Sequence, residues 1–314
     1  MNQSVSPPPT PTKRLPPSPC VGICTMNDDV GLCLGCGRNR DEITGWISID
    51  DDSKVKIWKE LPGRMAQLGA TSFRLAPEPD QIAAFARDTL DERAGRWVMG
   101  STGASASFDA KSVIDVTEND DWVTAHSSDG QIVRIKKHDR MRAFGLTLGD
   151  ESKRMKAVAL VIPRGRAKLE QSDTMAMLGP DQDAADATNQ AATLFDLAVG
   201  RTYSRVLLRA PVKKISSVFQ PLAGQPFASI TGQLHLLLNQ TDIVVETALG
   251  RIESDQSNAI ELVASPSIEE GAADNSLTKN NLDRFENIKI SQAFAIGAVF
   301  HAHDPAWLVG RLTP

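Results

Sequence analysis

All four cysteines of this 314-residue chain lie in one short stretch that begins at Cys20 and ends at Cys36. They form two pairs with the spacing Cys-x3-Cys-x8-Cys-x2-Cys. Four thiolates this close in sequence can surround one tetrahedral ion, and thiolates also hold Fe–S clusters. A glycine inside each pair lets the backbone wrap closely around such a group. We therefore predict metal ligation by Cys20, Cys24, Cys33 and Cys36.

Composition limits the surroundings in which this site works. The formal net charge is -5, so the chain as a whole lacks the basic footprint expected of a nucleic-acid-binding protein. No apolar run approaches the roughly 20 residues of a membrane span, and no signal peptide is visible. We expect a cytoplasmic protein. Thiols stay reduced in that compartment, which favours metal ligation over disulfides.

Changes in composition along the chain predict four segments. Residues 1–19 are a proline-rich tail that we expect to be disordered. Residues 20–68 form a small Cys₄ metal-binding module with two short helices, and residues 69–79 form a linker. Residues 80–314 form a larger, mainly antiparallel α+β domain, so the fold class is α+β. A module of about 50 residues is too small to fold by apolar burial alone and needs a staple such as a metal.

The two helices of the module are predicted from apolar residues at helical spacing. The first carries Ile43, Trp46 and Ile47 on one face. The second begins near Asp50 and is interrupted at Pro62. Its inward positions are Val55, Ile57, Trp58 and Leu61. We expect Trp46 and Trp58 to pack over the cysteine loops.

The larger domain shows strand-like runs separated by turn signals. Asp129-Gly130 between two alternating runs predicts a β-hairpin. Asp80 is a candidate cap for a helix with Ile82, Phe85 and Leu90 inside. An alanine-rich pattern predicts another helix over residues 181–199, and the polar residues 265–287 predict a surface loop.

The cysteine stretch is similar to a known bacterial domain. Cys20-x3-Cys24, Cys33-x-Gly35-Cys36-Gly37-Arg38, Asp41-Glu42-Ile43, Trp46 and Pro62-x-Arg64 resemble a short domain of unknown function, widespread in proteobacteria and described as a predicted Fe–S protein. The resemblance covers about residues 19–65. Spacing alone favours structural zinc, the commoner occupant of four cysteines. The resemblance makes an Fe–S cluster an equal candidate, so the cofactor is either an Fe–S cluster or Zn²⁺.

The larger domain resembles a second uncharacterised bacterial family. The similarity rests on three motifs: Trp97-x2-Gly100-x2-Gly103-Ala104-x-Ala106-x-Phe108, Phe195-Asp196-Leu197 and Leu249-Gly250-Arg251-Ile252-Glu253. This resemblance implies no reaction and no substrate. No catalytic residue can be named from it.

Two further features are candidates for binding. His301 and His303 are two apart, so on a strand both imidazoles share a face and Asp304 follows them. Residues 134–168 contain eleven basic and three acidic residues, a local patch that suits an anion, RNA or an acidic partner if its strands share a face. Packing histidines and a charged sheet edge are the ordinary explanations of such patterns.

These observations favour a metal-binding protein whose cysteine site docks a protein partner or senses redox state without catalysing a reaction. An alternative is an Fe–S redox enzyme or accessory protein. A further alternative is anion or nucleic-acid binding through residues 134–168. The sequence leaves open whether the protein is an enzyme.

Overall fold

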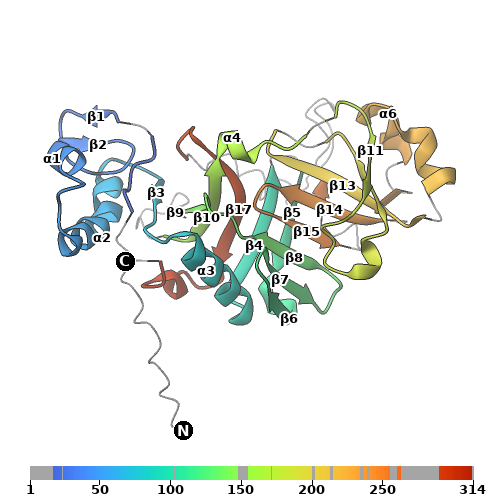
Figure 1. Cartoon of the computed structure of the whole chain (residues 1–314), viewed down its shortest axis with the longest axis horizontal. Coiled ribbons are helices and arrows are strands. Elements are labelled where there is room, and N and C mark those ends of the chain that lie inside the picture. The colour runs from blue at the N-terminus through green and yellow to red at the C-terminus, as the bar shows by residue number, and fades with distance from the viewer. Residues whose placement is uncertain are drawn as a thin grey trace, which may run out of the picture.

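The computed structural model describes residues 17–22, 24–101, 104–147, 155–170, 172–199, 202–212, 215–233, 237–238, 241–254, 260–262 and 290–312. The predicted loop at 265–287 and most of the predicted tail lie outside these residues. Residues 17–68, which we call the cysteine region, lie at one end of the molecule, and the sheets of residues 72–302 extend away from them (Figure 1). The fold is α+β and consists mainly of sheet, as predicted.

The cysteine region contains a two-stranded hairpin and two helices. The hairpin pairs β1 with β2, and the helices α1 and α2 follow it. The elements are β1 (Met26–Asn27), β2 (Leu32–Cys33), α1 (Arg40–Thr44) and α2 (Asp51–Gln67).

The first large sheet has seven antiparallel strands in the order β16-β5-β4-β17-β10-β9-β3. Its strands come from widely separated parts of the chain, since β17 near the C-terminus lies between β4 and β10. The strands are β3 (Ser72–Arg74), β4 (Gly95–Ser101), β5 (Ala104–Asp109), β9 (Arg142–Leu146), β10 (Ala157–Pro163), β16 (Ile260–Leu262) and β17 (Phe294–Ala302).

The second large sheet has eight antiparallel strands in the order β11-β12-β13-β14-β15-β8-β7-β6. The predicted Asp129-Gly130 hairpin joins β7 to β8 and is confirmed. The strands are β6 (Val113–Glu118), β7 (Trp122–Ser127), β8 (Ile132–Lys136), β11 (Ala176–Pro180), β12 (Thr193–Asp196), β13 (Ser204–Ala210), β14 (Asp242–Thr247) and β15 (Gly250–Ser254).

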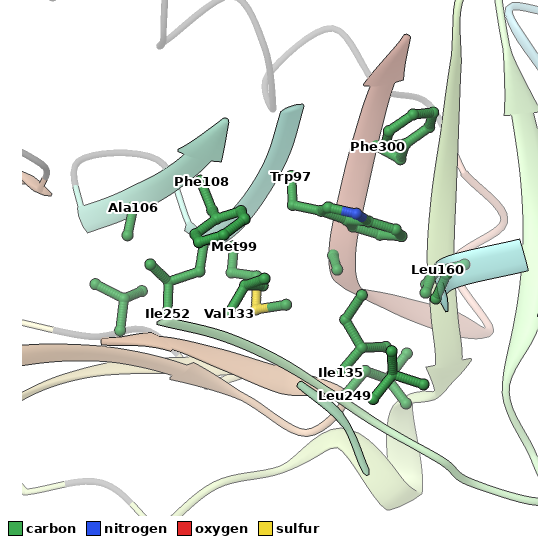
Figure 2. Close-up of a cluster of buried hydrophobic side chains, with 14 of the residues drawn as sticks. Trp97, Met99, Ala106, Phe108, Val133, Ile135, Leu160, Leu249, Ile252 and Phe300 are labelled. Atoms are coloured by element: carbon green, nitrogen blue, oxygen red, sulfur yellow. The ribbon is translucent and has the colours of Figure 1, made fainter. Parts of the chain in front are cut away.

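One apolar core joins the two sheets (Figure 2). Trp97 and Phe108 of the first sheet share it with Val133 and Ile252 of the second, and all four are fully buried. The helix α3 (Pro79–Asp91) adds its predicted inner face to the same core. The short helices α4 (Arg164–Ala167) and α6 (Phe227–Ile230) lie in connections.

Two glycines of the predicted family motifs have a steric role. Gly100 has φ +117°, and a Cβ there would lie 2.3 Å from the carbonyl oxygen of Ala104. Gly250 has φ +155°, and its Cβ would lie 2.3 Å from the carbonyl oxygen of Arg134. Neither position can take a side chain without moving backbone. These motif glycines therefore allow close contact between neighbouring strands.

Several predicted helix features are wrong. The helix over 181–199 is absent, because Thr193–Asp196 pairs with β13 as strand β12. The helix α2 continues through Pro62, since Leu61 and Met65 on either side are buried and hold it in place. The N-cap residue of α3 is Glu78 rather than Asp80. Pro79 occupies the first helical position, where proline is favoured because an N–H there would have no partner within the helix.

Candidate metal centre

The β1–β2 hairpin carries the third predicted ligand, Cys33. Cys33 pairs with Met26 across the hairpin and is fully buried. The side chain of Asn27 accepts hydrogen bonds from the amides of Asp29 and Val30, which fixes the turn between the strands. The short hairpin thus holds Cys33 at a defined place although only two residues pair on each strand.

A tight turn after Cys33 brings Cys36 back toward it. The Gly37 amide donates to the Cys33 carbonyl at 2.8 Å, and the Cys33 amide donates to the Arg38 carbonyl at 2.8 Å. Gly37 has φ +72°, and a Cβ there would lie 3.3 Å from the Met65 sulfur of α2. Glycine therefore lets this turn pack directly against α2.

Backbone amides point at sulfurs in both halves of the cysteine stretch. The Gly22 amide lies 3.4 Å from Cys20 Sγ. The Arg38 amide donates to Cys36 Sγ in the same way, two residues after the cysteine. Such donors stabilise a thiolate, and this repeated arrangement fits the charge of a metal-bound sulfur.

A hydrogen bond and electrostatic interactions relate the four thiols to one another. The Cys24 thiol hydrogen-bonds that of Cys20 and interacts electrostatically with Cys36, which interacts in turn with Cys33. The charge of Cys20 raises the pKa of Cys24, and burial raises the pKa of Cys36 against the hydrogen bonds from Arg38. None of the four forms a disulfide.

The thiols are not yet arranged as one coordination sphere. Within the described residues, which include all four cysteines, no group of three or more His, Cys, Asp or Glu side chains is placed to hold one ion. Cys33 and Cys36 are buried, whereas Cys24 is exposed. The donor set fits Zn²⁺ or an Fe–S cluster chemically, and Cys24 is the most exposed of the four thiols.

The buried Arg38 and the half-buried Arg74 bring positive charge to the cysteines. The Arg38 side chain donates to Cys36 Sγ and lies 4.8 Å from the Trp46 ring centroid. Arg74 Nη1 of β3 donates to the carbonyl of Cys20 at 3.0 Å. Burial, with the charge of Arg142 nearby, lowers the pKa of Arg74 to about 10. Both guanidiniums would offset the charge of four thiolates.

A small apolar cluster and one ion pair hold the two helices together. Trp58 and Leu61 of α2 are buried in this cluster, and Trp46, which follows α1, packs against it. Arg64 of α2 grips both carboxylate oxygens of Glu42 in α1 at 2.6 and 2.9 Å. The predicted burial of Ile47 is wrong, since α1 ends at Thr44 and Ile47 is 94% exposed.

The second metal candidate, His301 and His303, is not gathered around an ion. His301 lies in β17 opposite Arg96, whereas His303 follows the strand and lies 3.2 Å from Asp109. In the described part of the chain these histidines join no cluster of metal-binding side chains. Their contacts are those of residues that pack a strand end.

The basic residues of 134–168 do not share one sheet. Arg134 and Lys136 lie in β8 of the eight-stranded sheet, and Arg142 lies in β9 of the seven-stranded sheet. Arg134 is buried and stacks 4.3 Å from the Trp122 ring centroid. The condition for one continuous patch, strands on a common face, is therefore not met by these residues.

A charged cluster in the eight-stranded sheet was not foreseen from the sequence. Asp181 accepts two hydrogen bonds from Arg251 at 2.8 and 2.7 Å and one from Arg209 at 2.8 Å, and Glu253 pairs with both arginines. These four side chains are at most 3% exposed. The sequence signal that could have revealed this cluster is the motif Arg251-Ile252-Glu253. In it, charged residues alternate with an apolar one, so on a strand both charges share one face.

A cavity of about 480 Å³ lies beside the start of α3. It is lined by Asp80, Asp120, Asp139 and His138 among others. Glu118, also in its wall, is ion-paired with Lys137 at 2.6 Å, and this contact lowers the pKa of its carboxyl. The charge of Glu118 is thus already compensated, and in the same wall His138 Nδ1 lies 2.9 Å from Asp139 Oδ1.

Comparison with known proteins places both parts of the chain. Residues 81–270, more than half of the chain, match the model of a family of unknown function, DUF6925. The chain belongs to this family. Residues 18–65 match a second family model, a protein of unknown function, DUF1289. Both resemblances predicted from the sequence are confirmed.

Curated relatives match the cysteine region. The uncharacterized protein YdhL of Escherichia coli strain K12 is 38% identical over 69 residues, which are 22% of this chain and 86% of YdhL. YdhL of Shigella flexneri gives the same values, and YdhL of Escherichia coli O6:H1 is 36% identical. No solved structure matches the chain. In the described residues no helix is both long and apolar enough to cross a membrane.

Proposed function

We propose that Cys20, Cys24, Cys33 and Cys36 together bind one Zn²⁺ ion or one Fe–S cluster. The observation that supports this best is the hydrogen-bonded turn that holds Cys33 and Cys36 together, with backbone amides at the sulfurs of Cys20 and Cys36. Side-chain rotations within both cysteine pairs, including that of the exposed Cys24, would bring four thiolate ligands around one ion. Cys33 and Cys36 would form the fixed half of this site because they are buried in the turn that packs on α2.

The site serves docking or redox sensing rather than catalysis. Four thiolates leave a zinc ion no open position for a substrate, so such a site is structural. An Fe–S cluster would add a reversible one-electron change. In both cases Arg38 and Arg74 offset thiolate charge, and the amides of Gly22 and Arg38 orient two sulfurs.

Metal analysis of anaerobically purified protein tests the proposal. Brown protein that contains iron and sulfide identifies an Fe–S cluster and a redox role. Colourless protein with one zinc per chain identifies a structural site. Protein that contains neither metal and takes up neither on reconstitution contradicts the proposal.

The variant Cys33→Ser tests the ligand assignment. We expect it to lose its metal and to lose protection from proteolysis in the cysteine region, because metal binding supplies folding free energy there. The sheet core contains no cysteine and should keep its thermal transition. Leu34→Ser is the matched control, since Leu34 is adjacent but 44% exposed. Unchanged metal content in Cys33→Ser would show that Cys33 is not a ligand.

A further inference from the structure

The first predicted ligand of the cysteine site lies on a segment that packs on the seven-stranded sheet. We call residues 17–22 the N-terminal arm. Val21 of the arm is 3% exposed and packs in an apolar cluster on the seven-stranded sheet. The partners are Phe144, Leu146, Ala157, Ala159, Val161 and Val299. Ser291 Oγ also donates to the Val21 carbonyl at 3.1 Å. Cys20 therefore precedes a residue that is anchored in the sheet.

Side chains from α2 and β3 hold the other carbonyls of the N-terminal arm. Trp58 Nε1 donates to the Pro17 carbonyl at 3.0 Å. Arg74 Nη1 donates to the carbonyls of Ser18 at 2.6 Å and Cys20 at 3.0 Å. The arm thus lies between α2 and the edge of the seven-stranded sheet, where β3 is the last strand. Proline residues in the arm offer no N–H to a sheet, so these side chains supply its fixation.

The third and fourth ligands belong to a different part of the structure. Cys33 and Cys36 are carried by the hairpin and by the turn at Gly37, which packs on Met65 of α2. The hairpin has no residue in the apolar cluster that holds Val21. Cys20 therefore belongs to the sheet-anchored arm, Cys33 and Cys36 belong to the hairpin and its turn, and Cys24 lies in the segment between these two bodies.

We propose that the bound metal fastens the N-terminal arm to the hairpin and so keeps the arm docked on the seven-stranded sheet, and that metal loss releases the arm and uncovers the apolar site of Val21. This inference rests on the proposed metal site. One buried valine and a few hydrogen bonds form a weak tie, whereas thiolate–metal bonds form a strong one. Arm docking follows metal occupancy for that reason. Loss of the metal would thereby expose an apolar site on the sheet that includes Phe144, Leu146 and Val161.

The test compares hydrogen exchange in the full chain with and without Zn²⁺. The amides to follow are those of β3 and of residues 290–294, because they contact the N-terminal arm but lie far from the cysteines in sequence. We expect chelation of Zn²⁺ to speed their exchange about tenfold or more, as for a local opening. Val21→Asp should exchange fast with or without Zn²⁺ while it still binds one ion. Val21→Ala should show the same change to a smaller degree.

Val30→Asp is the matched control. Val30 is also a valine of the cysteine region and lies between Cys24 and Cys33, but it is 40% exposed on the hairpin turn. It should behave like the unmodified protein. One Zn²⁺ per chain with no effect of chelation on these amides overturns the locking role and leaves the metal site standing. The same holds if Val21→Asp keeps the Zn²⁺-dependent protection. Protein that binds no Zn²⁺ and no iron removes both proposals.

Discussion

The cysteine region and the sheets are stabilised in different ways. The sheets share a continuous apolar core in which Trp97, Phe108 and Val133 are fully buried. The cysteine region has a small apolar cluster of its own residues Ile57, Trp58 and Leu61, which Ala76 completes, and depends otherwise on caps and ion pairs. Apolar burial on this small scale leaves little stability after the entropy cost of folding. This difference is the physical reason why we propose a metal at one end of the molecule and not at the other.

The largest effect is expected from Trp97→Ala in the shared core. Trp97 is fully buried, and its Nε1 donates to Thr89 Oγ1 at 2.9 Å. Truncation leaves a cavity and should cost about 3–5 kcal/mol of unfolding free energy. Urea denaturation followed by far-UV circular dichroism measures this loss, and added Zn²⁺ should not restore it.

Ile114→Ala is the control for the core, since Ile114 lies on strand β6 and is 66% exposed. Its unfolding free energy should stay within about 0.5 kcal/mol of the unmodified protein. Equal losses in the two variants would contradict the view that the shared core carries the stability of the sheets.

A smaller effect is expected at the buried charged cluster. Asp181→Asn leaves Arg209 and Arg251 short of one carboxylate and should cost about 3 kcal/mol at neutral pH. Burial alone would raise the pKa of Asp181, but hydrogen bonds and charge from Arg251 and Arg209 lower it. The folded-state pKa thus lies below the unfolded value of about 4.

This lowered pKa fixes the sign of the pH dependence. The stability that Asp181 contributes is fully present above the unfolded pKa and is lost as the pH falls through the folded pKa. The unfolding free energy of Asp181→Asn should therefore fall less steeply below about pH 4. Asp183→Asn is the control, because the side chain of Asp183 is exposed. Parallel acid denaturation curves for Asp181→Asn and the unmodified protein would rule out this role.

Local patterns in the sequence predicted the elements that local forces determine. The helix with Ile82, Phe85 and Leu90 inside is present as α3, and the Asp129-Gly130 turn joins β7 to β8. Helical spacing of apolar residues and a turn dipeptide each act over a few positions. Such features can be read without knowledge of the tertiary structure.

Long-range contacts decided where the sequence predictions were wrong. The alanine pattern over 181–199 has helical spacing, yet Asp181 is held by arginines 28 and 70 residues away in the chain. Strand pairing with β13 then extends Thr193–Asp196. The cysteines were evident from their spacing, whereas Arg74 approaches Cys20 from 54 residues away and no local pattern reveals it. Tertiary contacts override propensity at these sites.

The smallest effect, and the sharpest test of the cysteine region, is expected from Arg64→Ala. Arg64 holds Glu42 through two hydrogen bonds, and the side chains are 20% and 13% exposed. Loss of this bidentate, partly buried pair should cost about 1 kcal/mol. Faster hydrogen exchange in α1 measures it, because the pair ties α1 to α2. Arg87→Ala is the control, since Arg87 also pairs with carboxylates but is 42% exposed, and it should have almost no effect.

If metal-loaded Arg64→Ala shows unchanged exchange while the metal-free form shows faster exchange, the metal alone is sufficient to hold the two helices. If both forms are unchanged, the ion pair contributes nothing, and the packing of Trp46 after α1 on the apolar cluster around Trp58 is sufficient to keep α1 beside α2.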